Sequence, residues 1–196
     1  MKKYLIAGLL AAGIAAPAFA QDAGADNGRF TGFRVEGLAG YDRVNSDGHS
    51  DGVSYGAGVG YDFQAGNMVV GIEGEAADST VDECVNGAVT IADRLCVKAG
   101  RDLYAGGRIG AVVGSNTLLY AKAGYTNARV NSEYEDGTAG TAADFNLHQN
   151  LDGIRAGVGA EFGVGTNAFI KAEYRYSNYE QGIERHQGVV GVGLRF

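Results

Sequence analysis

Apolar and polar residues alternate along eight segments of the chain, each of roughly ten residues. In one segment, every second position from Tyr55 to Phe63 is apolar, while Ser54, Asp62 and glycines occupy the positions between. Successive side chains of an extended strand point to opposite faces, so this period of two predicts strands with one apolar face. The predicted strands cover residues 30–43, 52–64, 67–77, 99–113, 117–128, 150–163, 168–178 and 187–196.

The connections between these segments are alternately short and long. Glycine and asparagine mark tight turns at 65–67, 114–116 and 163–167, whereas the polar stretches 44–51, 78–98, 129–149 and 179–186 are predicted loops. Strands joined in this way run antiparallel, with all the turns at one end and all the loops at the other. The pattern therefore predicts an all-β fold, an eight-stranded antiparallel up-and-down transmembrane β-barrel with periplasmic termini and turns.

The face opposite the apolar one carries acids and bases in comparable number. In a soluble fold, burying a face of this kind would strongly destabilise the protein. In a narrow barrel the charges pair with one another and hold trapped water. We therefore predict that the apolar face contacts lipid and that the tyrosines anchor the barrel at the headgroup boundary. The predicted barrel-interior charges are Glu36, Asp62, Glu73, Glu75, Asp102, Arg108, Lys122, Arg155, Glu161, Lys171, Glu173, Arg175 and Arg195.

The amino-terminal residues have the features of an export signal. Lys2 and Lys3 precede an apolar run, and Ala18-Phe19-Ala20 is a small-x-small cleavage pattern, so we expect cleavage between Ala20 and Gln21. The predicted parts are a signal peptide (1–20), a short periplasmic segment (21–29) and an outer-membrane barrel (30–196). Loss of the two lysines changes the net charge from −7 to −9. Such an acidic chain is a poor nucleic-acid binder, and no nucleic-acid partner is expected.

The chain offers few groups for chemistry. Cys84 and Cys96 are its only cysteines, and in an exported loop they favour a disulfide over metal binding. His49, His148 and His186 lie at or near predicted loops, and His49 is followed by Ser50. Neighbouring residues point to opposite faces of a strand, so this pair does not form a serine–histidine contact directly. We expect no catalytic residue, no metal site and no cofactor.

Four stretches resemble the small eight-stranded outer-membrane barrels related to opacity proteins and to the transmembrane domain of outer-membrane protein A. They are Leu119–Tyr125, Ile154–Phe162, Phe169–Tyr176 and the closing Val190–Phe196. The resemblance implies insertion by the outer-membrane assembly machinery, with the terminal Phe196 as the assembly signal. It also implies contact with outer-membrane lipids and lipopolysaccharide, and a surface ligand that the resemblance leaves unidentified.

We expect a non-enzymatic outer-membrane protein that contributes to envelope structure and to surface interaction through its long loops. One alternative is a narrow porin-like channel for small solutes or ions, in which the interior charges line a wet path. A second is a barrel-embedded lipid-modifying enzyme, which requires serine, histidine and an acid at the barrel rim. Eight strands enclose an interior that side chains roughly fill, so wide diffusion is not expected.

Overall fold

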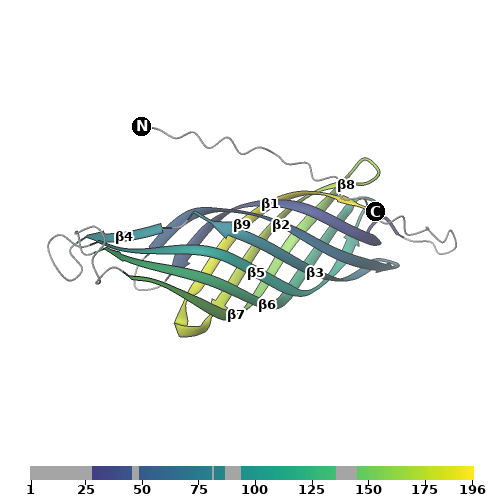
Figure 1. Cartoon of the computed structure of the whole chain (residues 1–196). Helices are drawn as coiled ribbons and strands as arrows, with labels where there is room; N and C mark the ends of the chain where they lie inside the picture. The colour runs from purple at the N-terminus through teal and green to yellow at the C-terminus, as the bar shows by residue number, and fades with distance from the viewer. Residues whose placement is uncertain (1–27, 46–48, 81, 87–93, 136–144) are drawn as a thin grey trace, which may run out of the picture.

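The computed structural model describes residues 28–45, 49–80, 82–86, 94–135 and 145–196 as a closed antiparallel β-barrel (Figure 1). Neighbouring strands pair in the order β3-β2-β1-β9-β8-β7-β6-β5-β4, and a β3–β5 pairing closes the ring. The predicted eight-stranded up-and-down barrel is therefore confirmed. Among the described residues, no helix is long and apolar enough to cross a membrane. The barrel strands are β1 (Gly32–Asn45), β2 (His49–Ala65), β3 (Met68–Ser79), β5 (Arg94–Val113), β6 (Thr117–Glu135), β7 (Phe145–Val164), β8 (Ala168–Tyr179) and β9 (Glu184–Arg195).

Three tight turns lie at the same end of the barrel as the start of β1 and the end of β9. Gly66, Gly114 and Gly165 occupy these turns with φ values of 60°, 70° and 63°. A residue with a Cβ is disfavoured in this left-handed region, which explains glycine at each turn. We call this the turn end, and we call the opposite mouth the loop end.

The outer wall is apolar and bounded by aromatic rings. Large outward residues such as Val59, Ile72 and Ile154 are exposed, the last to 71%. Tyr41, Tyr55, Tyr125 and Tyr174 lie toward the loop end, while Phe33, Phe63, Phe162 and Phe196 lie toward the turn end. An apolar band between two aromatic girdles matches the hydrocarbon core and the two interfaces of a bilayer. The wall is therefore built to face lipid.

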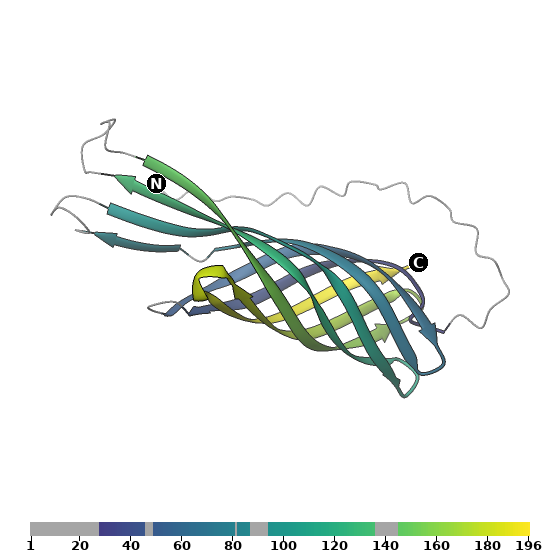
Figure 2. The same ribbon diagram turned by 90° about the horizontal axis from the view of Figure 1, so that it is seen from below.

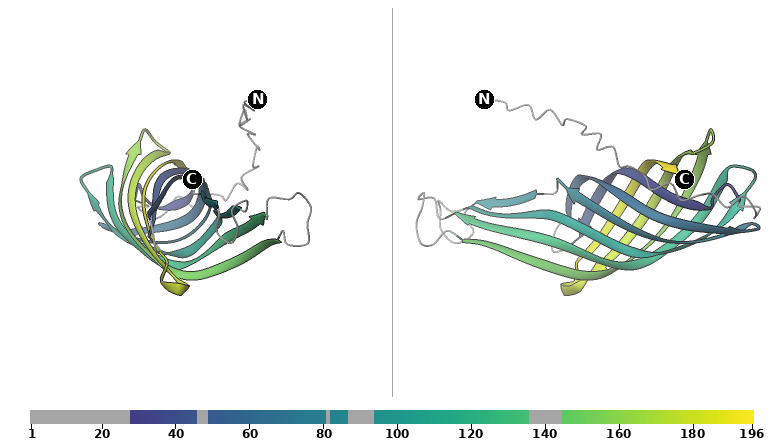
Figure 3. Two further views of the ribbon diagram at one scale, coloured as in Figure 1. Left: turned by 90° about the vertical axis from the view of Figure 1, so that its left-hand side faces the viewer. Right: turned by 45° about the vertical axis from the view of Figure 1, so that its right-hand side comes forward.

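Two of the predicted loops are wrong over much of their length. β5, β6 and β7 continue past the barrel mouth into residues assigned to the loops 78–98 and 129–149. A further strand, β4 (Asp82–Asn86), pairs with β5 in the same region. Figures 2 and 3 show these four strands rising on one side of the mouth. We call this four-stranded extension, residues 82–86, 94–101, 128–135 and 145–152, the projecting sheet.

The extension was hidden in the sequence for two physical reasons. A register shift between Ala99 and Asp102 in β5 breaks the period of two, because a bulge moves the following residues to the other face. The outer strands of the sheet are also rich in charged and amide residues, which composition assigns to loops. At the other connections the errors are smaller: β9 begins at Glu184, inside the predicted loop 179–186, and β1 and β2 extend into 44–51.

Several sequence predictions lie outside the described residues. The signal peptide, its cleavage between Ala20 and Gln21, and residues 21–27 all belong to this group. Of the predicted periplasmic segment, Gly28 and Arg29 are described, and Arg29 Nη2 donates a hydrogen bond to Gly165 O at 2.7 Å. The next residue, Phe30, is buried, with Gln64 Oε1 accepting from its N–H at 3.0 Å. The chain thus enters β1 across the turn end of the barrel.

Candidate functional site

The interior of the barrel is filled with paired charges. All thirteen residues assigned to the interior from the sequence are buried there. Arg34, Asp42 and Arg185 join them, which makes eight acids and eight bases among the residues described. Arg34 and Asp42 share the even-numbered face of β1 with Glu36, so strict alternation could have found them. Arg185 was missed because it lay in a predicted loop.

The turn-end layer is organised around two acids, Asp62 and Glu161. Asp62 accepts hydrogen bonds from Arg34 Nε at 3.2 Å, from Arg108 at 2.8 and 2.6 Å, and from Arg195 Nη1 at 2.7 Å. Glu161 pairs with Arg108 at 3.0 Å and with Arg195 at 2.5 Å. These five residues come from β1, β2, β5, β7 and β9. The layer therefore ties opposite walls of the barrel together.

Phe30 closes this layer from below. It is 1% exposed and packs with Val69, Leu118 and Tyr120 in an apolar cluster. Arg195 Nη1 donates a hydrogen bond to Phe30 O at 2.6 Å, and the guanidinium lies 5.7 Å from the ring centroid. Phe30 thus fills the barrel interior beside the charged layer, with its ring against the Arg195 guanidinium.

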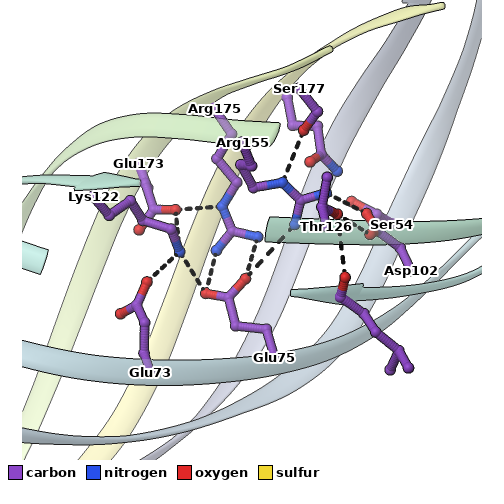
Figure 4. Close-up of polar contacts among 12 residues, drawn as sticks. Ser54, Glu73, Glu75, Asp102, Lys122, Thr126, Arg155, Glu173, Arg175 and Ser177 are labelled. Carbon is purple, nitrogen blue, oxygen red and sulfur yellow. Dashed lines mark hydrogen bonds and ion pairs between the residues drawn. The ribbon is translucent and has the colours of Figure 1, made fainter. Parts of the chain in front are cut away.

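The middle layer holds four glutamates and four bases, one of which, Arg34, also belongs to the turn-end layer. Figure 4 shows the part of it around Lys122 and Arg175. Lys122 Nζ contacts Glu73 at 2.6 Å, Glu75 at 2.8 Å and Glu173 at 3.1 Å. Arg175 pairs with Glu75 at 2.8 Å and also with Glu173. Further pairs join Lys171 to Glu36 at 2.8 Å and to Glu173 at 3.5 Å, Arg34 to Glu36 at 3.0 Å, and Arg34 to Glu73.

The loop-end layer is centred on Asp42 and Asp102. Arg185 bridges the two aspartates, at 2.9 Å from Asp102. Arg155 also pairs with Asp102, and its Nε donates to Ser177 Oγ at 2.8 Å. Hydroxyl and amide groups complete the layer: Ser54, Ser79 and Gln187 each donate to Asp42 at 2.8 Å, and Thr126 donates to Asp102 at 2.8 Å. Buried carboxylates with several donors do not need bulk water to be satisfied.

Three tyrosines expected at the headgroup boundary lie inside the barrel instead. Tyr104, Tyr120 and Tyr179 are each at most 5% exposed. Tyr120 donates to Glu173 at 2.6 Å and lies under Arg108, while Lys122 lies 4.4 Å from the Tyr104 ring centroid. Each of the three is an even number of positions from the buried charges of its own strand: Tyr104 from Asp102, Tyr120 from Lys122, and Tyr179 from Arg175. The alternation of faces along a strand therefore predicts the side on which a tyrosine lies better than its position near a strand end does.

Of the three histidines, His186 is the one whose side chain the structure describes. His186 lies on the outer wall, where its Nδ1 is 2.7 Å from Tyr174 Oη, and Tyr176 donates to Glu184 at 2.9 Å. The side chains of His49, Ser50 and His148 lie outside the described set. Within the part of the chain that is described, no three His, Cys, Asp or Glu side chains are grouped closely enough to hold a metal ion.

The backbone places the two cysteines directly opposite each other. Cys84 of β4 pairs with Cys96 of β5 in the antiparallel register. Directly opposed residues in such a pair have Cα atoms about 4.5–5.5 Å apart, which is within the range that a disulfide spans. The Cys84–Cys96 disulfide stays a prediction, now with a cross-strand position on the projecting sheet.

A closed barrel with an apolar wall, aromatic girdles and an internally paired polar interior is the architecture of a transmembrane β-barrel protein. A family model described as outer membrane protein beta-barrel domain matches residues 6–196. The chain therefore belongs to this family of outer-membrane β-barrel proteins, and its location is the bacterial outer membrane. A search of curated proteins gave no match.

Solved structures similar to the chain share its fold at low sequence identity. Ail, the attachment invasion locus protein of Yersinia pestis, in complex with the heparin analogue sucrose octasulfate, is 15% identical with a TM-score of 0.58. That match covers 85% of this chain and 99% of Ail. Neisserial surface protein A is 17% identical with a TM-score of 0.59, over 85% of this chain and 98% of that protein. Both are small outer-membrane barrels.

Proposed function

We propose that the chain is a non-enzymatic outer-membrane barrel that anchors the projecting sheet for contact at the cell surface. The observation that carries this proposal is the continuation of β5, β6 and β7 beyond the loop-end aromatic girdle as one hydrogen-bonded sheet with β4. At the rise of a β-strand, eight residues reach about 25 Å beyond the barrel. A hydrogen-bonded sheet at that height presents a surface of defined shape.

The filled interior supports an anchoring role over a channel. Each of the sixteen buried charged side chains is at most 8% exposed. A continuous aqueous path would leave the groups that line it in contact with water, and a ring of one sign would select ions. Here acids and bases are paired within each layer, and over the whole interior eight acids balance eight bases. We infer that the interior is a structural plug.

The net charge separates the surface proposed here from the polyanion site in the Ail structure. The full chain has 16 basic and 23 acidic residues, and eight of the bases are buried inside the barrel. Outside the interior eight bases remain against fifteen acids, and this excess of negative charge disfavours a sulfated sugar such as the heparin analogue bound to Ail. A partner that is apolar or basic fits this surface better.

The first test is single-channel conductance of the refolded mature protein in a planar bilayer, with heat-modifiable gel mobility on the same sample. We expect a folded barrel that gives no steady openings. Salt-dependent openings would establish the channel alternative, and Arg155→Ala with Glu161→Ala should then alter them. Lipid hydrolysis by the wild type that Ser50→Ala abolishes would establish the enzyme alternative.

The second test removes the surface and keeps the barrel. Val130 and Gln149 are register partners, so deleting residues 131–148 and joining the ends through Asn-Gly shortens the β6–β7 hairpin without a register slip. We expect the variant to keep heat-modifiable mobility and to lose the attachment of whole cells to host-type protein matrices. A matched insertion of Asn-Gly after Gly114, at the turn end, should leave attachment unchanged. Equal attachment in both variants would contradict the proposed role.

A further inference from the structure

One part of the outer wall is indented. A groove of about 950 Å³ runs over β1, β2 and β3 and is bordered by β8 and β9. The small outward residues Gly37, Ala39, Ala57 and Ala76 line it. A Cβ added at Gly37 would meet no atom within 4 Å, which marks how far the wall recedes there. The lipid-facing wall therefore has a hollow between its two aromatic girdles.

A ridge of branched side chains stands beside this groove. Ile170 of β8 and Val190 and Val192 of β9 are exposed large residues that line the other side of the groove. β9 pairs directly with β1, so that Val190 lies opposite Ala39 and Val192 opposite Gly37. Branching at Cβ restricts these side chains to few rotamers, which makes the ridge stiff. A projection and a hollow thus lie side by side on one wall.

The strand register gives the direction of the membrane normal on this wall. A path from each residue to its paired neighbour, once around the ring, starts on β1 and returns to β1 ten residues nearer the loop end. It passes through Phe33, Tyr61, Ile72, Gly107, Ala123, Ala156, Tyr176, His186 and Arg43. Rows of paired residues therefore climb toward the loop end from β1 to β2 to β3, and the strands tilt the opposite way.

Residues that are stacked along the normal follow from this tilt. Strands are about 4.8 Å apart and rise about 3.3 Å per residue, so a line along the normal moves to the next strand about two residues nearer the loop end. The line of the ridge is Ile170, Val190 and Tyr41, and the line of the groove is Val35, Ala57 and Asp78.

The two lines match in height. Ala57 lies two strands further along the rows than Val190, which raises it by about 6 Å, and two residues back along its strand, which lowers it by about 5 Å. The same offset relates Ile170 to Val35 and Tyr41 to Asp78. A two-fold axis along the normal, midway between the lines, brings the ridge of each copy into the groove of the other. Such a contact is isologous and closes at two copies.

The polar ends of the two lines are also complementary. Tyr41 and Asp78 are both exposed, at the loop-end height of the wall. The two-fold contact places the Tyr41 hydroxyl of one copy opposite the Asp78 carboxylate of the other, as donor and acceptor. Lipid tails are as apolar as valine, so close packing and hydrogen bonds drive association in a membrane. An acyl chain in the groove loses conformational freedom that the stiff ridge has already lost.

We propose that two copies of this chain form a two-fold dimer in the membrane through this wall, with the ridge of each copy seated in the groove of the other. This inference goes beyond the proposed surface role. β6 lies four strands from β1 in either direction around the ring, so the dimer places the two projecting sheets on its outer sides. Both sheets stay accessible from outside the cell.

Energy transfer between donor-labelled and acceptor-labelled full-length copies in lipid vesicles measures the association. Ala57→Leu fills the groove, and we expect it to weaken association at least about tenfold while heat-modifiable mobility is kept. Val190→Ala in the same chain frees the space again and should restore much of the association, because each contact contains one Ala57 and one Val190. The control is Ala123→Leu, the same change at an outward position of β6, which should have no effect.

A single cysteine tests the symmetry. Ala39 lies close to the proposed axis, so in a Cys84→Ser/Cys96→Ser background Ala39→Cys should be joined to its own equivalent by a short thiol cross-linker. We expect one dimer band, and none for Ala123→Cys. Equal association of Ala57→Leu and Ala123→Leu, a ladder of larger species, or a monomeric wild type that retains a lipid in native mass spectrometry would overturn the inference. None of these outcomes bears on cell attachment, which tests the proposed function separately.

Discussion

Asp62 shows what a single interior residue does in this barrel. It is fully buried and accepts from guanidinium groups of β1, β5 and β9, so its charge is shared by three strands. The sequence could place Asp62 on the inward face because alternation fixes the face of each strand residue. It could not name the partners, because these depend on how the strands stagger around the closed ring. Arg34, by contrast, lies two residues before Glu36 on the same face of β1, so alternation applied strictly would have placed it inside as well.

Replacement of Asp62 by asparagine removes the carboxylate charge that three buried arginines share. Breaking a buried ion pair in this way costs about 3–5 kcal/mol. We expect Asp62→Asn to lower the free energy of unfolding by that amount in urea titrations with lipid vesicles. The control is Asp51→Asn, whose pair with Arg43 at 3.0 Å is exposed and should contribute little. Equal effects from the two variants would argue against the interior as the source of stability.

Glycines on the inward face make room for the interior rings. A Cβ added at Gly159 would lie 2.7 Å from Cζ and Oη of Tyr120, whereas one added at Gly37 meets no atom within 4 Å. We expect Gly159→Ala to destabilise the barrel by about 1–3 kcal/mol through overpacking. Gly37→Ala, on the outer wall, should be close to neutral. Urea titrations of both variants check this, and a neutral Gly159→Ala would mean that Tyr120 can move aside.

Among the elements, β4 is the one that sequence analysis could least have found. Its five residues lie between stretches of mixed composition, and β5 opposite it carries the bulge that shifts the register. A strand that short has no periodic signature of its own and forms because β5 supplies a partner. By contrast, β8 and β9 were predicted nearly to their ends, because their full length crosses the membrane and alternates without interruption.

The cross-strand position of Cys84 and Cys96 predicts that the disulfide holds β4 on the sheet. We expect the exported protein, denatured without reductant, to take up no thiol-alkylating reagent, and to take up two equivalents after reduction. Mass spectrometry measures both. The bond closes a short loop and should contribute about 3 kcal/mol to local stability. Alkylation without reductant would contradict the pairing. Faster hydrogen exchange of the β4 amides in the double variant Cys84→Ser/Cys96→Ser than in the wild type would support it.

At the scale of the whole molecule, the barrel is taller on one side. β8 and β9 are 12 residues long, while β5, β6 and β7 have 19 or 20. The loop-end mouth is therefore oblique, with the short 3₁₀ helix η1 (Glu180–Gly182) on its low side and the projecting sheet on its high side (Figure 3). The sequence predicted the ring, the turn end and the two faces, since all three follow from local alternation and turn residues. The oblique mouth depends on pairing between distant segments.

This asymmetry fixes what the cell presents to its surroundings. An epitope tag inserted between Ala139 and Gly140, in the β6–β7 connection, should be bound by antibody on intact cells. The same tag between Gly114 and Ser115 should be bound only after the outer membrane is permeabilised, because short turns are periplasmic. Flow cytometry distinguishes the two. Surface staining at Gly114 would mean that the barrel is inserted in the opposite direction.

The pairing of Arg195 also bears on how the protein enters the membrane. Its partners, Asp62 and Glu161, lie on β2 and β7, on either side of β9 in the ring. Until β9 meets β1, a partly built sheet carries eight positive and eight negative groups on a face that hydrocarbon would touch. Intermediates with an open seam are thus disfavoured in lipid. Insertion and closure should take place as one cooperative event, in which the carboxy-terminal strand completes the electrostatic balance of the whole interior.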